Sequence, residues 1–439
     1  MNFAQCRAYL DSLQVLGIKL GLDSIRTLLK ALGNPHLNYP TLLVAGTNGK
    51  GSVCAMLTRI LSRHGLRAGL YTSPHLVAVE ERIRVNDRLI SRPAFCRALT
   101  GVRKAADSLL RAGTLPSPPT HFEVLTCAAL SYFKTTRVDI AVLEVGMGGR
   151  FDATNVVTPI LSVITSIGRD HEKYLGHTID QIAFEKAGII KPEVPVVSGV
   201  LRPTAAAVIR KRARELQAPY LGALDPPHTL KAVKSRTGYR FVYDLAGKKY
   251  SFSPGLAGLH QGRNAAVALA AAVRLGQVWR PLQKALIIRG IEETRWPGRL
   301  ETVRRSPRAI LDGAHNPDGV RALRDYMSDF VRRPVILVFG VMKDKDISGL
   351  ARILFPVAKK IILTKFPYHR AAEPADILRK ARPFAGRILI EPDPSRAYRL
   401  ALAEARRRKG CVLVAGSLFL VGAIKSFLAG NGHHTQQPG

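Results

Sequence analysis

The sequence predicts an α/β protein built around mostly parallel sheets. Three observations support this: strand-length apolar runs recur along the 439 residues, helical stretches separate them, and the apolarity inside the runs is continuous. Continuous runs are typical of parallel strands, because helices cover both faces of such a sheet. A chain of this length with 46% hydrophobic residues is expected to form two or more domains.

The first part of the chain contains four apolar runs, each followed by a turn and a helical stretch. A hairpin is predicted at 238–253, where alternation is broken by Ala246-Gly247, and a helix is predicted at 262–276. The runs are TLLVAG (41–46), AGLYTS (68–73), VDIAVLEVG (138–146) and PILSVITSIG (159–168).

The strand–helix alternation restarts after Trp296 to Gly298, where we place a domain boundary. We therefore expect a larger domain over 1–296, a smaller one over 297–430 and a loose tail over 431–439, which has no apolar residues. The runs of the smaller domain are RAILDGAHN (308–316), PVILVFG (334–340), KKIILTK (359–365), GRILIEP (386–392) and GCVLVAG (410–416).

Composition excludes several classes of protein. The longest apolar run, AAVALAAAV (265–273), is about half of the roughly 20 residues that cross a bilayer, so no membrane partner is expected. Arg7 and Asp11 interrupt what would be the core of a signal peptide, which favours a cytoplasmic protein. The five cysteines are scattered and never form a C-x-x-C pair, so we expect buried thiols rather than disulfides or a cysteine zinc site.

The net charge of +34 raises the hypothesis of a basic, ATP-dependent nucleic-acid-binding protein. The excess is spread along the whole chain, however, and no nucleic-acid motif accompanies it, so no specific nucleic acid is expected. Solvated helix faces account for most of it. A positive field also concentrates small polyanions such as nucleotides near the protein.

The stretch LLVAGTNGKGS (42–52) is an altered phosphate-binding loop. The common pattern is G-x-x-x-x-G-K-[ST], in which backbone N–H groups hold phosphate and the hydroxyl binds Mg²⁺. Here Gly46 lies only three residues before Gly49, Gly51 stands where the hydroxyl belongs, and Ser52 comes one position late.

Polar side chains follow the other apolar runs, at the edge where ligands bind in an open parallel sheet. Ser73 and His75 end the second run, Glu144 the third, and Asp170 and His171 the fourth. Ser73 could replace the missing hydroxyl. Imidazole is an unusual ligand for Mg²⁺, so His171 indicates a second, less selective metal position.

A predicted helix over 178–188 carries a lysine on its inward face. Thr178 and Gln181 form a capping box at its start, and Gly188 can end it. A desolvated amine at Lys186 could capture CO₂ and become a carbamate, which is a carboxylate-like metal ligand. The alternative is a lysine that reaches the surface or pairs with a carboxylate. The inward face comprises Ile179, Ile182, Ala183, Lys186 and Ala187.

These motifs resemble those of the folylpolyglutamate synthase/dihydrofolate synthase family, which belongs to the Mur ligase superfamily. The resemblance covers most of the chain. It includes GTNGKGS (46–52), TSPHL (72–76), HFEVLT (121–126), EVGMGGRFDATN (144–155), SIGRDH (166–171), EKAGIIK (185–191), GLHQGRNAAVAL (258–269), WPGRLE (296–301), LDGAHNP (311–317) and FGVMKDKD (339–346).

The resemblance implies a P-loop, Mur-ligase-type ATP-binding domain with a folate site, followed by a Rossmann-like domain on the glutamate side of a cleft. It also implies roles for particular residues; Arg169 departs from the apolar residue more common in the family. Lys50, Lys186, His171 and Arg299 would be catalytic. Thr47, Asn48, Gly49, Lys50, Gly51, Ser52, Asn264, Arg299, Asp312 and His315 would bind ATP. Ser73, Glu144, His171 and Lys186 would bind metal, and Phe122, Glu123, Asp152 and Ala153 would lie at the pterin.

The implied reaction is the ATP-dependent addition of L-glutamate to dihydropteroate or a folate through an acyl phosphate. The expected cofactors are two Mg²⁺ ions, with ATP as co-substrate and K⁺ as a further candidate. The partners are small molecules, and a monomer is expected. A folylpolyglutamate synthase without the dihydrofolate activity and a Mur-type ligase acting on another carboxylate remain alternatives. The HFEVLT and TSPHL motifs argue against a peptidoglycan precursor.

Overall fold

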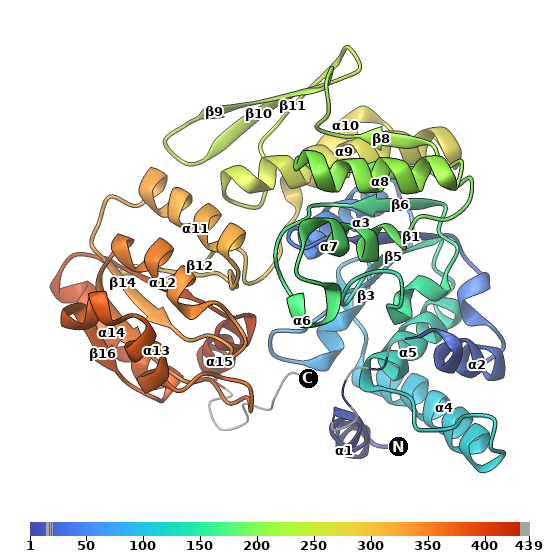
Figure 1. Ribbon diagram of the computed structural model, residues 1–439, viewed down its shortest axis with the longest axis horizontal. Helices are drawn as coiled ribbons and strands as arrows, with labels where there is room; N and C mark the ends of the chain where they lie inside the picture. Colours follow the sequence, from blue (N-terminus) through green and yellow to red (C-terminus); the bar gives the residue numbers. More distant parts are fainter. Residues whose placement is uncertain (15–16, 18, 20, 431–439) are drawn as a thin grey trace.

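The computed structural model describes residues 1–14, 17, 19 and 21–430, so the predicted tail lies outside the described residues. The predicted α/β class is confirmed. Two large sheets, each covered by helices, lie side by side, with a small sheet above them in the view of Figure 1. Within the described ranges, no helix has the length and apolarity needed to cross a bilayer.

The larger sheet has eight strands in the order β4-β3-β2-β5-β1-β6-β7-β8. The six strands from β2 to β8 are parallel to one another, and β3 and β4 add an antiparallel edge. Their bounds are β1 (Thr41–Ala45), β2 (Ala68–Tyr71), β3 (Ile83–Val85), β4 (Arg88–Leu89), β5 (Ile140–Glu144), β6 (Leu161–Ile164), β7 (Val196–Ser198) and β8 (Tyr220–Gly222).

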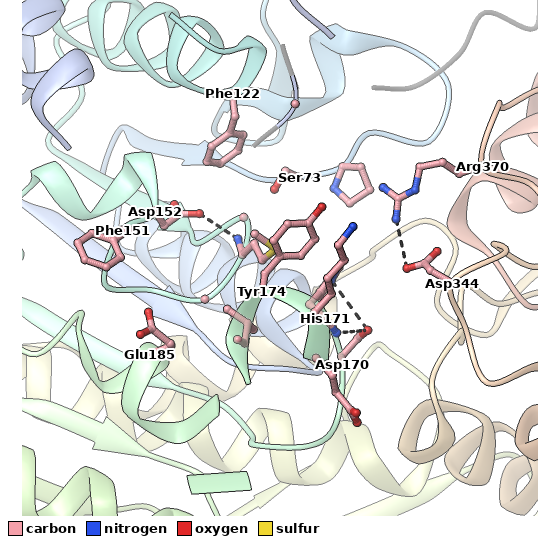
Figure 2. A pocket seen from close by; sticks show the side chains of 18 of the residues that line it. Ser73, Phe122, Phe151, Asp152, Asp170, His171, Tyr174, Glu185, Asp344 and Arg370 are labelled. Carbon is pink, nitrogen blue, oxygen red and sulfur yellow. Dashed lines mark hydrogen bonds and ion pairs between the residues drawn. The ribbon is translucent and has the colours of Figure 1, made fainter. Parts of the chain in front are cut away.

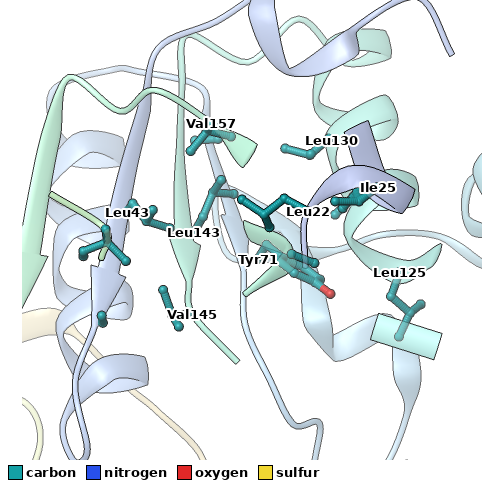
Figure 3. Close-up of a cluster of buried hydrophobic side chains, with 14 of the residues drawn as sticks. Leu22, Ile25, Leu43, Tyr71, Leu125, Leu130, Leu143, Val145 and Val157 are labelled. Carbon is teal, nitrogen blue, oxygen red and sulfur yellow. The ribbon is translucent and has the colours of Figure 1, made fainter. Parts of the chain in front are cut away.

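Helices bury both faces of this sheet, which explains the continuous apolar runs. Leu43 packs in the cluster drawn in Figure 3, whereas its neighbours Leu42 and Val44 point to the opposite cluster. Successive strand residues face opposite sides, so both sides must be apolar. The helices of this part are α1 (Phe3–Gln14), α2 (Asp23–Ala31), α3 (Lys50–Arg63), α4 (Arg92–Arg111), α5 (His121–Thr135), α6 (Glu172–Leu175), α7 (Ile179–Ala187), α8 (Pro203–Glu215), α9 (Leu259–Val278) and α10 (Lys284–Glu293). Short 3₁₀ turns are η1 (Pro35–Leu37), η2 (Val79–Arg82) and η3 (Ala153–Val156).

The predicted hairpin is confirmed, and it gains an unpredicted third strand. Strands β10 (Tyr239–Leu245) and β11 (Lys248–Phe252) pair antiparallel across Ala246 and Gly247, which both have positive φ. Strand β9 (Thr229–Lys234) pairs with the other side of β10. Its sequence, TLKAVK, is largely exposed and has no apolar run, which is why the pattern did not predict it.

The second large sheet has the order β12-β13-β17-β14-β15-β16, in which only β12 is antiparallel. Strand β12 was not predicted because its sequence, ETVRR, is polar. The strands are β12 (Glu301–Arg305), β13 (Arg308–Leu311), β14 (Val335–Phe339), β15 (Ala358–Leu363), β16 (Ile388–Ile390) and β17 (Cys411–Ala415). The helices are α11 (Pro317–Phe330), α12 (Ile347–Leu354), η4 (Phe355–Val357), α13 (Pro374–Lys380), η5 (Arg382–Arg387), α14 (Pro394–Arg407) and α15 (Leu418–Leu428).

The two large sheets share no strand, and the chain passes between them once, through residues 294–300. The predicted boundary at 296–297 falls in this segment and stays a prediction. All five cysteines are buried and free, as expected.

Candidate active site

The altered phosphate loop joins β1 to α3 and ends in a tight left-handed turn. Gly49 has φ +86, and a Cβ there would lie 2.3 Å from Oδ1 of Asn264, so no other residue fits without displacement. The first N–H groups of α3 have no partner within the helix. Such N–H groups, together with the helix dipole, can hold a phosphate, and here the first of them belong to Lys50, Gly51 and Ser52.

The segment after β6 is hydrogen-bonded to the start of this loop. The amide of Thr47 donates to the carbonyl of Ser166 at 2.8 Å, and the amide of Asn48 donates to Oγ of Ser166 at 3.0 Å. The Thr47 hydroxyl bonds the backbone of Gly168, and Thr165 Oγ1 donates to the Asn48 carbonyl at 2.7 Å. The loop and residues 165–168 therefore form one connected unit.

Two lysines meet at the carbonyl oxygen of Gly46. Nζ of Lys50 and Nζ of Lys186 each donate to it at 3.1 Å. Helix α7 begins with the predicted Thr178–Gln181 capping box, and Lys186 is 4% exposed, so its predicted inward direction is confirmed. Burial, reinforced by the charge of Lys50, lowers the pKa of Lys186 to about 7. The neutral amine that carbamate formation requires is therefore populated near pH 7.

Glu144 and Ser73 lie together beside these lysines. The Ser73 amide donates to Oε2 of Glu144 at 3.2 Å, and the Glu144 carboxylate is buried. Burial raises its pKa, while Lys50, the Ser73 amide and Arg299 act in the opposite direction. A Cβ on Gly51 would lie 3.5 Å from Glu144 and 3.0 Å from Nε1 of Trp296, so glycine at this position lets the loop pass close to the buried carboxylate.

The donor atoms of Ser73 and Glu144 fit Mg²⁺. Both offer oxygen ligands, and a divalent cation would offset the charge of a buried carboxylate. The second predicted position is different, because His171 offers nitrogen and Lys186 is a ligand only as a carbamate. The described part of the chain contains no group of three or more His, Cys, Asp or Glu side chains arranged to hold a metal. A metal ion held by His171 and Lys186 would therefore require the carbamate form of Lys186.

His171 is the N-cap residue of α6, has φ +53 and lines the cavity. Partial burial lowers the pKa of its imidazole to about 4; Asp170 opposes this, and the nearby Lys345, Lys50 and His315 add to it. A neutral imidazole can bind a metal ion without losing a proton.

Residues of α9 and of the connecting segment complete the surroundings of the loop. Gln261 donates to Oγ of Ser52 at 3.3 Å and accepts from Nδ2 of Asn264 at 2.9 Å. The Ser52 hydroxyl is therefore already bonded within the protein. Asp312 accepts from the amides of Leu300 at 2.8 Å and Ala314 at 2.9 Å, so its carboxylate holds the backbone beside Arg299.

The predicted pterin residues surround one end of a cavity of about 1130 Å³ that both large sheets line. Figure 2 shows Phe122 and Asp152 on one side and Asp344 and Arg370 on the other. Glu123 accepts from the Thr120 amide at 2.7 Å as part of a capping box. Asp152 accepts from the amides of Met147 at 2.9 Å and Thr154 at 3.0 Å. Both carboxylates thus shape the cavity wall through the backbone.

The predicted residues divide between this cavity and the loop behind it. Ser73, Phe122, Glu123, Asp152, Ala153, His171 and His315 line the cavity. Thr47, Asn48, Gly49, Lys50, Gly51, Ser52, Glu144, Lys186, Asn264, Arg299 and Asp312 do not line it and gather around the phosphate loop or the connecting segment.

Some cavity residues were not predicted as site residues. Arg82 donates to Nδ1 of His75 at 2.9 Å, and Lys345, Tyr368 and Arg370 come from the loops that follow β14 and β15 of the second sheet. The FGVMKDKD motif (339–346) marks Lys345 in the sequence, but it does not indicate that this side chain reaches a cavity lined by both parts of the chain.

Comparison with known proteins identifies the family. The Mur ligase middle domain matches residues 44–272, and the Mur ligase, glutamate ligase domain matches residues 298–418. A folylpolyglutamate synthase from Lacticaseibacillus casei is 36% identical over 435 residues, which cover 98% of this chain and 99% of the relative. A dihydrofolate synthase/folylpolyglutamate synthase from Bacillus subtilis (strain 168) is 34% identical over 430 residues, covering 97% and 99%. The chain belongs to the folylpolyglutamate synthase/dihydrofolate synthase family of Mur ligases.

The three-dimensional match agrees with this assignment and confirms the resemblance inferred from the motifs. The solved structure of E. coli FolC in complex with DHPP and ADP superposes with a TM-score of 0.87 and 30% identity, covering 98% of each chain. As a member of this family of Mur ligases, the chain is an ATP-dependent ligase.

Proposed function

We propose that this chain adds L-glutamate to dihydropteroate and to the γ-carboxylate of reduced folates, using ATP. The names of its relatives, which include both activities, support this, as does the similar protein solved with DHPP and ADP. The observation that carries the proposal is the meeting of Lys50, Lys186, Ser73 and Glu144 around the phosphate loop, behind a cavity shared by both sheets.

The chemistry brings three anions together: ATP, the acceptor carboxylate and glutamate. The free N–H groups of α3 and the ammonium of Lys50 would hold the phosphates, and Asn264, Arg299, Asp312 and His315 would complete the nucleotide site. Mg²⁺ held by Ser73 and Glu144 would neutralise phosphate charge when bound. His171 and carbamylated Lys186 would hold the second ion. K⁺ stays a candidate.

The acceptor carboxylate attacks the γ-phosphate of ATP and forms an acyl phosphate, with release of ADP. The amine of glutamate then attacks the acyl carbon, loses a proton, and inorganic phosphate leaves. An acyl phosphate hydrolyses in water, so the cavity must exclude solvent while glutamate is bound. The position of the cavity between the two sheets meets this requirement, because closure of the sheets would cover it.

The acceptor would lie with its pterin ring at Phe122 and Ala153. Phe122 packs 5.9 Å from the ring of Tyr71 and lies against Gly146, which gives an apolar wall for a flat heterocycle. Glu123 and Asp152 would fix this wall through their backbone hydrogen bonds. The assignment of both acceptors to one site follows from their shared pterin and carboxylate.

The test supplies purified protein with ATP, glutamate, Mg²⁺ and one acceptor at a time, and measures ADP release together with the mass of the product. Turnover with dihydropteroate and with tetrahydrofolate is expected. Turnover with tetrahydrofolate but not with dihydropteroate would show that the chain lacks dihydrofolate synthase activity. Turnover with neither acceptor would overturn the proposal. Lys50→Met, which removes the phosphate-binding cation, provides the inactive control.

A further inference from the structure

The carboxylate of Asp170, beside the first large sheet, contacts three side chains from the part of the chain that contains the second large sheet. Asp170 follows β6, and its side chain is 8% exposed. It accepts from Nζ of Lys345 at 2.5 Å and from Nδ2 of Asn316 at 3.2 Å, and it lies 3.5 Å from Nε2 of His315. Figure 2 shows Asp170 next to His171 at the cavity.

A second contact ties the same part of the second sheet directly to the phosphate loop. Asn48 and Asn316 exchange two hydrogen bonds through their side-chain amides, at 3.2 Å and 2.9 Å. Asn316 is buried and also caps α11 by accepting from the Gly319 amide at 2.9 Å. The start of α11 is thus docked on the loop that would hold the phosphates.

The Asp170 contacts can exist only when the two sheets are close together. The sheets share no strand and are linked by one segment, so noncovalent contacts determine their relative position. When they separate, Asp170 loses all three partners. The backbone beside it is bonded to Thr47, whose hydroxyl donates to the Gly168 carbonyl at 3.1 Å and accepts from the Gly168 amide at 3.0 Å. A shift of the phosphate loop on nucleotide binding would therefore reach Asp170.

We propose that Asp170 is a positioning residue that couples occupation of the phosphate loop to closure of the second sheet over the cavity. It acts through Lys345, His315 and Asn316 and does not touch the reacting atoms. The coupling rests on the proposed function, since closure is needed to protect an acyl phosphate. Charge-assisted bonds are the strong ones among hydrogen bonds, so loss of this carboxylate should affect closure more than loss of a neutral contact.

The structure offers a matched control at the other end of α11. Asp329 also joins the two parts of the chain, accepting from Nζ of Lys234 at 2.5 Å and from the hydroxyl of Tyr239. These partners belong to β9 and β10, which form no hydrogen bond to the phosphate loop within the described part of the chain. Asp329→Asn therefore removes a contact between the same two parts that is independent of the loop.

The experiment measures the distance between spin labels at Arg214→Cys on α8 and Asp325→Cys on α11, with and without a nonhydrolysable ATP analogue, Mg²⁺ and tetrahydrofolate. Both positions are exposed, and all native cysteines of the described residues are buried. In the otherwise unmodified chain, ligands should shift the distance distribution toward one shorter component. Asp170→Asn should remove most of this shift, and Asp329→Asn should retain it.

Steady-state kinetics separate positioning from simple loss of structure. For Asp170→Asn, kcat/KM for glutamate should fall roughly tenfold or more, and the Kd for the ATP analogue should rise because coupling is reciprocal, while the circular dichroism of the ligand-free protein stays unchanged. Lys345→Gln approaches the same contact from the other sheet and should remove the same distance shift. The Asp170→Asn and Lys345→Gln effects should be less than additive in the double variant.

A normal shift and normal kinetics in Asp170→Asn would overturn the proposal, and so would an equal loss in Asp329→Asn. If Asp170→Asn does not fold, Lys345→Gln decides by the same criteria. If the chain shows no glutamate-dependent turnover but only Asp170→Asn and Lys345→Gln lose the ligand-dependent shift, the coupling stands and the proposed function fails.

Discussion

Nζ of Lys186 donates to the carbonyl oxygen of Gly46 at 3.1 Å, which places a buried lysine of α7 against the backbone of the phosphate loop. The contact joins two segments that are 140 residues apart in the chain. The amine of Lys186 therefore lies beside the loop that precedes α3, where the proposed phosphate site begins.

Lys186→Ala should reduce turnover on the order of 100-fold or more, because the second metal position loses its only carboxylate-like ligand. Short carboxylic acids or bicarbonate should partly restore the rate by occupying the space. Initial rates with and without added acetate or propionate check this. Full activity of the unrescued variant would exclude a metal-ligand role.

Glu144→Gln should raise the Mg²⁺ concentration needed for half-maximal rate and lower kcat on the order of 100-fold, because a neutral amide is a weaker ligand. The variant should remain folded, since the pKa of Glu144 is raised by burial and the charged form is already disfavoured in the folded protein. Mg²⁺ titrations and thermal unfolding, with Ser73→Ala in parallel, provide the measurement. A loss of folding with an unchanged Mg²⁺ requirement would assign Glu144 a structural role.

Gly49→Ala should destabilise the protein by about 2 kcal/mol and weaken nucleotide binding. The added methyl meets Asn264 Oδ1 at 2.3 Å, and φ +86 is unfavourable for alanine. Denaturant unfolding and nucleotide titration measure the two effects.

Two further variants separate the causes. Asn264→Ala, combined with Gly49→Ala, should recover the part due to the collision but not the part due to the backbone. Gly101→Ala is the control for stability, because Gly101 lies in α4 without positive φ and an added methyl there meets no atom within 4 Å. Equal losses of stability for Gly49→Ala and Gly101→Ala would contradict this explanation.

His260 should make the protein less stable as the pH falls from 6.5 to 4. Burial, together with the charges of Arg299 and Arg263, lowers its pKa from 6.5 to about 4. Its Nε2 lies 3.2 Å from the Gln261 amide nitrogen, and among the described residues its buried Nδ1 has no partner. Between these pH values the unfolded chain binds more protons, so the free energy of unfolding decreases by at most about 1.4 kcal/mol per pH unit.

His260→Asn should lack this contribution. Urea unfolding at pH 4.5, 5.5 and 7.5 gives the free energy of unfolding of both proteins. The value for the unmodified chain minus the value for His260→Asn should increase as the pH rises. Parallel stability curves across that range would show that His260 does not titrate differently in the folded state.

Local patterns in the sequence determined most of the fold. The continuous apolar runs predicted the parallel strands because residues on both faces of a covered strand must be apolar. The Thr178–Gln181 capping box and the apolar spacing after it predicted that Lys186 faces inward, since helical periodicity determines which residues share a face. Strands β9 and β12 were missed because their residues are polar and their pairing partners stabilise them. Strands β3, β4, β7 and β8 were missed as well, because runs of two or three residues are too short to show a pattern.

The phosphate loop and the polar residues after each strand were also visible in the sequence, because parallel strands bring their carboxyl ends to one edge. Only the tertiary structure decided which of those side chains reach one another. In the folded chain, Glu123 and Asp152 accept hydrogen bonds from backbone amides, and Asp170 lies against Lys345, which is 175 residues away in the sequence. Sequence spacing records neighbours along one element, whereas contacts between the two sheets depend on how they pack, and no local pattern carries that information.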